Sequence, residues 1–397
     1  MESESNTLRP GSVVYTVFSI LFLGLLSAFA PFVTDMYLPT LPSLGTEFDT
    51  SASMVQLGLT TSMIGLALGQ VFFGPMSDKY GRKPVLTLSL TLFCVATVLC
   101  IFSRGIELFL AMRLFQGLGA SGGIVLSRSV AADLYSGRQL AKMMAIIGAV
   151  NGVAPVAAPV VGGMVASFAG WQGIFAVLCG IGVVLLLMNG FFQESLPCGL
   201  RAEGSLAAML RNYRKVFANK EFMVYTAAFA MSQGVLFAYI AAAPFIVQHN
   251  FGFNEMQFSV VFGINALAIG IGSALSMRFK TMQKASLFGT WGMLAAAAGM
   301  LAFNLTLKSF WSYEAVTWLM LLAMGFVFTG ATTVAMDKGR EYIGVASATV
   351  GASGFIMGGL VSPLVGIGDV LVACPVVCLS CALMALAALR VSSVRRR

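Results

Sequence analysis

The chain has few charged residues and a single histidine. Asp, Glu, Lys and Arg make up only 10% of its 397 residues, whereas 58% are hydrophobic. Soluble domains carry about 25% charged residues, so a sizeable soluble domain is excluded. His249 alone excludes a multi-histidine metal centre, and the seven cysteines show no metal-site or disulfide spacing. We expect a polytopic helical membrane protein without a cofactor.

Long apolar runs occupy most of the chain. A membrane span needs about 20 predominantly apolar residues, and twelve such runs are present. They cover residues 13–37, 51–73, 85–103, 107–130, 140–166, 171–193, 221–247, 256–278, 285–305, 313–335, 342–365 and 369–390. We predict an all-α fold with two six-helix bundles, at 1–193 and 221–397, joined by a cytoplasmic loop at 194–220.

Basic residues are distributed unevenly between the predicted loops. With the N-terminus inside, 21 of the 24 Lys and Arg residues fall on the inner side, while Arg104 and Lys308 fall outside and Arg113 lies within a span. The positive-inside rule therefore places both termini in the cytoplasm. Topology and contact with anionic membrane lipid account for the net charge of +8, so we expect no nucleic-acid partner.

Two short segments suggest an internal repeat. The segment at 30–33, Ala-Pro-Phe-Val, recurs at 243–246 as Ala-Pro-Phe-Ile, 213 positions later. The segment at 110–113, Leu-Ala-Met-Arg, recurs at 322–325 as Leu-Ala-Met-Gly, 212 positions later. Repeated bundles with a site between them are typical of transporters. This alignment places Gly325 where the first bundle has Arg113.

Asp35 and Arg113 are charged residues that lie within predicted spans, away from the span ends. A carboxylate at a helix centre costs roughly 2.5–3.5 kcal/mol on insertion scales, so it marks a functional site. We predict that the two form a proton-coupling pair in the outer half of the first bundle, in direct contact or linked by a water or ligand; a static buried salt bridge is the structural alternative. Ten other acids are interpreted as boundary markers: Glu47, Asp49, Glu107, Glu194, Glu221, Glu255, Glu314, Asp337, Glu341 and Asp369.

Further polar and small residues follow stripes on single helix faces. The expected cavity-lining candidates are Pro31, Gln116, Asn151, Gln233, Phe237, Tyr239 and Asn265. In the fifth span, Gly148, Gly152, Pro155 and Pro159 recur every three to four residues and form a small-residue stripe suited to close helix contact. The stripe is a packing seam, a hinge between the bundles, or both.

The loop between the second and third spans contains two glycines within a charged segment. Its key residues are Gly74, Asp78, Gly81, Arg82 and Lys83. The glycines permit tight turns, and Asp78 suits a nearby helix N-terminus, whose dipole favours an anion. As a bare charge cluster the segment is equally well explained as a topology anchor.

The spacing of this loop resembles the loop signature of the major facilitator superfamily. The segment from Arg113 to Ala120 resembles that superfamily's intramembrane arginine motif, and the stripe from Gly148 to Gly162 and Gly163 resembles its antiporter motif. The segment from Asp35 to Pro39, Asp-Met-Tyr-Leu-Pro, is similar to the bicyclomycin-resistance and chloramphenicol-efflux group of bacterial inner-membrane exporters. These motifs are confined to the first five spans.

The resemblance implies roles for several residues. Asp78 would brace the inner end of the eleventh span, and Arg82 would pair with Asp133 in a latch that joins the bundles when the cavity faces outward. The fifth-span motif would be the hinge. The implied protein is a proton-coupled multidrug exporter working by alternating access, with protons as coupling ions, small hydrophobic drugs or metabolites as substrates, and a monomeric state.

Two other functions compete with this one. The same fold could export or import an amino acid, short peptide or other small metabolite. An intramembrane enzyme would need clustered catalytic groups, which the sequence does not offer. We therefore expect a transporter and no enzyme.

Overall fold

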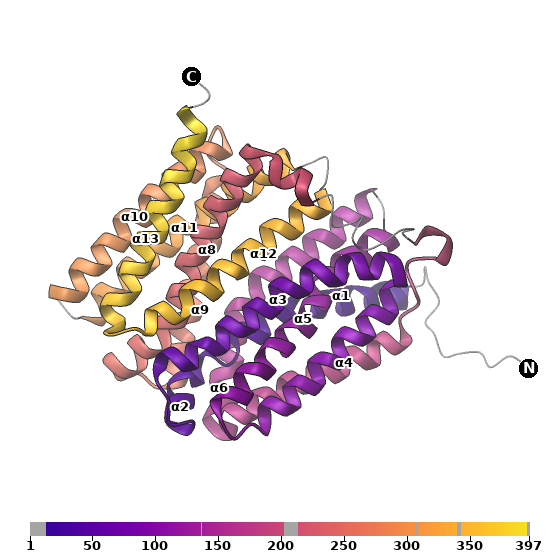
Figure 1. Cartoon of the computed structure of the whole chain (residues 1–397), viewed down its shortest axis with the longest axis horizontal. Coiled ribbons are helices and arrows are strands. Elements are labelled where there is room, and N and C mark those ends of the chain that lie inside the picture. Colours follow the sequence, from indigo (N-terminus) through magenta and orange to yellow (C-terminus); the bar gives the residue numbers. More distant parts are fainter. Residues whose placement is uncertain (1–12, 136, 202–212, 307–308, 340–342, 395–397) are drawn as a thin grey trace, which may run out of the picture.

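The structure, a computed structural model, describes residues 13–135, 137–201, 213–306, 309–339 and 343–394, and within these ranges it is helical without strands (Figure 1). Its elements are α1 (Val13–Asp35), η1 (Leu38–Thr40), α2 (Leu41–Glu47), α3 (Ala52–Tyr80), α4 (Arg82–Ile101), α5 (Ile106–Leu134), α6 (Gly137–Phe191), η2 (Cys198–Leu200), α8 (Lys220–Pro244), η3 (Phe245–Asn250), α9 (Glu255–Ser276), α10 (Met282–Thr306), α11 (Phe310–Lys338), α12 (Ile343–Val361), η5 (Ser362–Gly366) and α13 (Val370–Val394). The predicted all-α class is confirmed.

Helix α6 contains two of the predicted spans. A straight helix of 55 residues would be about 80 Å long, far more than the roughly 30 Å core of a bilayer. The helix breaks at Gly170, where φ is +62°, a conformation that glycine adopts without steric cost. In the described residues, eleven helices are long and apolar enough to span a membrane, with α6 counted once. The twelve-helix prediction is thereby confirmed.

The helices pack mainly within two groups. In the first, α3 and α4 pack on α5, and α1 packs on α5 and α6; in the second, α8, α9 and α10 pack on α11, and α12 and α13 pack on α8. Contacts between the groups run through α3 with α12 and through α6 with α9. We call the groups the first and second halves. The domain boundaries at 193 and 221 stay a prediction.

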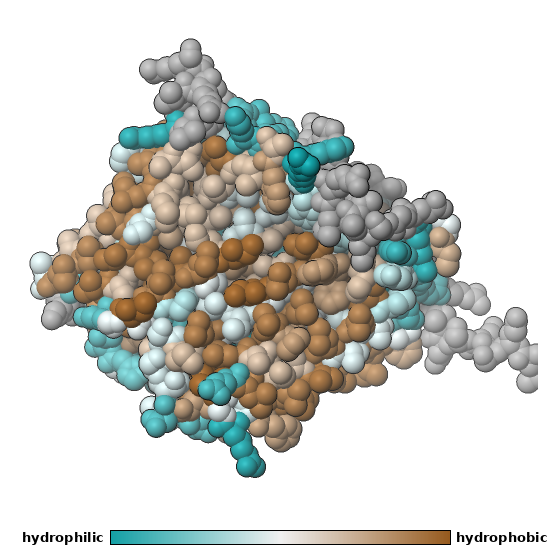
Figure 2. Space-filling view, in the orientation of Figure 1, coloured by the Kyte–Doolittle hydropathy of each residue, from teal (hydrophilic) through white to brown (hydrophobic). Residues whose placement is uncertain are grey.

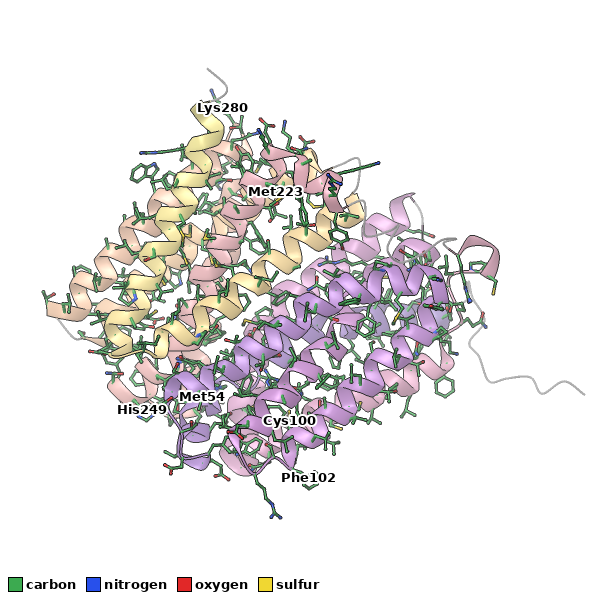
Figure 3. The ribbon with its side chains drawn as sticks, viewed as in Figure 1. Met54, Cys100, Phe102, Met223, His249 and Lys280 are labelled. Carbon is green, nitrogen blue, oxygen red and sulfur yellow. The ribbon has the colours of Figure 1, made fainter. Side chains whose placement is uncertain are left out.

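Hydrophobic and hydrophilic residues occupy different zones of the surface. Hydrophobic residues cover the middle of the visible face, and hydrophilic residues gather toward its margins (Figure 2). Met54, Phe102 and His249 lie at one end, whereas Met223 and Lys280 lie toward the other (Figure 3). Following the predicted topology, we call the end with Met54 the outer end.

Among the described residues, four hydrogen bonds join the two halves toward the outer end. Three start from α3 and one from η3, and all of their acceptors are backbone carbonyls. We call this set the outer seal. It consists of Ser53 Oγ to Pro363 (3.2 Å), Gln56 Nε2 to Ala241 (3.1 Å), Thr60 Oγ1 to Gly359 (3.0 Å) and Gln248 Nε2 to Pro39 (2.8 Å). The structure is therefore closed at its outer end.

Glycines bring α3 and α5 into backbone contact. A Cβ atom at Gly65 would overlap the carbonyl oxygen of Leu114, and one at Gly117 would overlap the carbonyl oxygen of Ser62. Small residues permit such close helix packing in membranes. The pair sets the register of α5 against α3, one turn from Arg113.

The second half repeats this contact and corrects the predicted repeat. A Cβ atom at Gly325 on α11 would overlap the carbonyl oxygen of Ile269 on α9. Gly325 thus corresponds to Gly117, 208 positions earlier, and Leu321 corresponds to Arg113. The sequence alignment at an offset of 212 was wrong by one helical turn, because a four-residue match cannot distinguish neighbouring turns of a helix.

Substitution at Gly162 tests whether close helix approach limits stability. A Cβ atom there would overlap the carbonyl oxygen of Met36. Overpacking of this kind costs about 1–3 kcal/mol, so we expect Gly162→Ala to lower the free energy of unfolding by this amount in a thermal or denaturant titration. Gly180→Ala on the same helix is the control, because no atom lies within 4 Å of its Cβ position. Equal stability of the two variants would contradict the packing.

Candidate functional site

Arg113 is fully buried in the first half. It has no solvent exposure, and its guanidinium donates through Nε to the Gly58 carbonyl (3.3 Å) and through Nη2 to the Val33 carbonyl (3.0 Å). Its Nη1 donates to Oε1 of Gln116. Cζ lies 4.3 Å from the ring centroid of Tyr37, a distance that supports a cation–π interaction. The charge is therefore satisfied by backbone, amide and aromatic groups.

Asp35 ends α1, two residues after the carbonyl that Arg113 contacts. The side chain is only 5% exposed, and its Oδ1 has no hydrogen-bond partner. None of the three acceptors of Arg113 belongs to Asp35. The two charges thus lie in the same region of the first half without an ion pair, so a static buried salt bridge does not describe this arrangement.

Tyr37 is a site residue that sequence reasoning did not single out. Its ring and that of Phe175 both adjoin the guanidinium of Arg113, whose Cζ lies 4.3 Å from the Tyr37 centroid and 5.6 Å from the Phe175 centroid. The centroids of the two rings are 5.9 Å apart. The hydroxyl oxygen of Tyr37 is buried without a partner. The sequence included Tyr37 in the Asp35–Pro39 segment but gave no sign of its contact with Arg113, because that contact forms only when the segment after α1 packs against α5.

The predicted cavity candidates fall into different environments. Gln116 is fully buried, bonded to Arg113 and, through Nε2, to Thr97 Oγ1 at 2.8 Å. It therefore orients the arginine within the first half, and its cavity-lining role stays a prediction. Pro31 is half-buried on α1. The side chain of Asn151 lies outside the described residues.

The candidates of the second half lie near α9 and α12. Tyr239 accepts a hydrogen bond of 3.0 Å from Asn265 Nδ2, and both residues are buried. Phe237 packs on Gly358, where Met63 of the first half also approaches. Gln233 packs on Gly354 and its Oε1 has no partner. Phe237 is thus the candidate placed at the junction of the halves.

The end of the fifth-span motif lies between Asp35 and the second half. The Cα of Gly162 faces the carbonyl of Met36, and the Cα of Gly163 faces Ser259 and the carbonyl of Glu255 on α9. Pro159 is buried and Pro155 half-buried on α6. Gly148 and Gly152 belong to α6, but their surroundings lie outside the described residues. The motif is thus a seam that also touches the segment after Asp35.

The inner loop between α3 and α4 is held by Arg82. This buried side chain donates through Nε to Oδ2 of Asp133 (2.8 Å) and through Nη1 to Ser77 Oγ (2.7 Å) and to Asp78. Gly81 has φ +99° and permits the turn. Asp78 therefore pairs with Arg82. A contact of Asp78 with the inner end of α12 is not among the described interactions, and residues 340–342 at that end lie outside the description.

Glu194 joins this network, although sequence analysis interpreted it as a boundary marker. Its carboxylate accepts from the backbone N–H groups of Arg82 (2.9 Å) and Lys83 (3.1 Å) at the N-terminus of α4. An anion at a helix N-terminus is favourable. Lys83 Nζ in turn donates to the carbonyls of Gly190 (2.9 Å) and Phe192 (2.7 Å) at the end of α6. The start of the central loop is thus fastened to the loop motif. Gly74, on α3, packs near Val125.

Comparisons with known proteins identify relatives along most of the chain. The sequence profile of the Major Facilitator Superfamily matches residues 23–363. The chain is 34% identical over 87% of its length to the uncharacterized MFS-type transporter YdgK of Bacillus subtilis, covering 88% of that protein. It is 29% identical over 88% of its length to a bicyclomycin resistance protein homolog of Haemophilus influenzae, covering 89% of that protein.

A solved structure shares the fold. A bacterial homolog of the human lysosomal transporter Spinster, in an inward-facing and unoccupied conformation, superposes with a TM-score of 0.74 at 17% identity, covering 97% of this chain and 96% of that one. In the described residues no group of three His, Cys, Asp or Glu could hold a metal ion. The chain therefore belongs to the Major Facilitator Superfamily and is a multi-pass membrane transporter, not an enzyme.

Proposed function

We propose that the protein is a proton-driven exporter of small, mostly hydrophobic drugs or related metabolites. It lies in the bacterial inner membrane with both termini in the cytoplasm, and it works by alternating access. The observation that carries the proposal is Asp35, a buried acid without an ion-pair partner, placed where the first half meets the seam with the second.

The names of the relatives support a drug as substrate. The Haemophilus influenzae relative that matches over most of this chain is described as a bicyclomycin resistance protein homolog. The segment from Asp35 to Pro39, which resembles the bicyclomycin-resistance group, lies at the end of α1 and in η1. Resistance by export needs an energy source, which an inward flow of protons supplies at about 2.3 kcal/mol per charge per 100 mV.

The environment of Asp35 supports a role in binding that proton. One carboxyl oxygen of Asp35 has no hydrogen-bond partner, and no ion pair of Asp35 is present among the described residues. A buried carboxylate of this kind is expensive when ionised, and a bound proton removes this cost. Arg113 satisfies its own charge through backbone carbonyls, Gln116 and Tyr37. Asp35 is therefore free to gain and lose a proton without leaving an unpaired arginine behind.

The segment that follows Asp35 connects it to the movement of the halves. The carbonyl of Met36 lies against Gly162, and the carbonyl of Pro39 accepts the Gln248 hydrogen bond of the outer seal. Opening the outer end breaks that bond and releases the turn, which gives water access to the carboxyl group. Proton uptake from outside would then precede closure, and substrate would leave in the open state.

The inner network supports a latch for the opposite state. In this outer-closed structure Arg82, Asp133 and Glu194 join elements of the first half, namely α4, α5 and the segment after α6. The network is thus assembled before the inner ends meet. When they close, its remaining acidic oxygens are positioned to accept from the inner end of α12.

Neutralising Asp35 tests the coupling role. We expect Asp35→Asn to reduce uncoupler-sensitive efflux of a fluorescent hydrophobic dye to the background of pump-deleted cells, because the amide cannot carry a proton. Expression and thermal stability should stay close to wild type, since the carboxyl makes no ion pair. Glu107→Gln, an exposed acid in the first turn of α5, is the control and should transport normally. Undiminished, proton-dependent efflux by Asp35→Asn would refute the role.

Two substitutions at Tyr37 separate its ring from its hydroxyl. Tyr37→Phe keeps the ring over Arg113, and we expect it to retain most transport and stability. Tyr37→Leu removes the cation–π contact, worth roughly 0.5–2 kcal/mol, so we expect lower thermal stability and slower efflux. The measurement is melting temperature in detergent together with dye efflux in cells. If both variants lose transport equally, the hydroxyl and not the ring is the functional group.

A further inference from the structure

A second acid lies inside the other half of the protein. Glu314 is in the first turns of α11 and is only partly exposed, whereas the sequence analysis interpreted it as a boundary marker. Its Oε2 is buried and has no hydrogen-bond partner. The structure therefore corrects that interpretation, because helix packing and not distance from the helix end determines burial.

The groups around Glu314 come from three helices and carry no positive charge. They are Asn265 from α9, Tyr239 from α8 and Tyr313 from α11. Cys374 of α13 adjoins the two tyrosines. Among the described residues, no lysine, arginine or histidine faces the carboxyl group; Lys308 lies outside the description. An ionised carboxylate in such surroundings is destabilised by burial, and no ion pair offsets this cost.

We call Glu314, Asn265 and Tyr239 the cluster. Its hydrogen bonds lack one donor. Asn265 is fully buried and donates through Nδ2 to the Tyr239 hydroxyl oxygen (3.0 Å), while its Oδ1 accepts nothing. An ionised carboxylate only accepts, whereas a protonated one also donates. A proton on Glu314 would supply a donor for Oδ1 of Asn265 and would neutralise the acid. Loss of the proton would favour the opposite amide orientation, with Nδ2 toward Glu314.

The cluster is connected to the outer seal through α8. Tyr239 accepts from Asn265, and the carbonyl of Ala241, two residues later, accepts from Gln56 of the first half (3.1 Å). On the outer side, Phe251 packs against Tyr313 with ring centroids 5.8 Å apart. A change in the hydrogen bonding of Tyr239 thus reaches a bond that keeps the outer end closed.

We propose that Glu314, with Asn265 and Tyr239, is a second proton-binding site, and that its protonated form stabilises the outer-closed arrangement. The proton-coupling site predicted in the first half is thereby joined by one in the second half. The role of the site in transport rests on the proposed proton-driven cycle, but its proton binding does not.

Infrared spectroscopy of the purified full-length protein tests the proton directly. Protonated carboxyl groups absorb at a different infrared frequency from carboxylates, and this frequency shifts in deuterated water. Difference spectra between two pH values therefore report the protonation of each buried acid. We expect two protonated-carboxyl components near neutral pH, one lost in Asp35→Asn and the other in Glu314→Gln. Glu314→Asp should keep a component at a shifted position, and Asn265→Leu should shift the Glu314 component by removing its acceptor.

The outcomes separate this inference from the proposed function. If Glu314→Gln loses a protonated-carboxyl component but Asp35→Asn loses none, the proton role of Asp35 is refuted and the second site stands. A Glu314→Gln spectrum identical to wild type at every pH would overturn the second site. So would a component that appears only after Lys308→Gln, since the acid would then be ion-paired and ionised in the native protein.

A distance measurement tests the link to the outer seal. Spin labels on Met54 of α3 and Leu364 of η5, in a background without native cysteines, report opening of the outer end. We expect raised pH to shift wild type toward longer distances and Glu314→Gln to stay short, because the amide mimics the neutral acid. The same pH response in Glu314→Gln and wild type would overturn the link.

Discussion

The first half of the structure depends on how a buried guanidinium is satisfied without an acid. Burying an ion costs several kcal/mol even after relaxation, so every donor of Arg113 needs a partner. The partners are the carbonyls of Val33 on α1 and Gly58 on α3, the amide of Gln116 on α5, and the face of Tyr37. Because they come from different helices, the arginine determines how α1, α3 and α5 sit relative to one another.

This arrangement leaves Asp35 without a counter-ion and makes protonation the simplest way to stabilise it. A direct ion pair would have held the acid ionised through the cycle. The acid instead ends its helix at the seam of the two halves, next to the contact between Met36 and Gly162. Glu314 occupies a comparable situation in the second half, near the outer end and among neutral partners. An acid without a cation on each side of the seam suits the proposed proton-driven cycle.

Glycine decides where the helices touch. In both halves a pair of glycines lets two backbones meet, between α3 and α5 and between α9 and α11, and these contacts define the true register of the repeat. The register places Leu321 at the position of Arg113, so the two halves share their packing and differ in their charges. Packing symmetry with chemical asymmetry is expected where similar bundles rock against each other.

The sequence by itself determined the helical class and the number of spans, because long apolar runs need helices in a membrane. The pairing of Arg82 with Asp133 was implied by the resemblance to the major facilitator superfamily. Only the tertiary structure decided that Arg113 bonds to backbone instead of Asp35, that Glu194 caps α4, and that Glu314 has a buried oxygen without a partner. These facts depend on which helix faces meet and on the register of one helix along the other. An error of one turn, as in the alignment of Gly325, changes the contacts assigned to each residue.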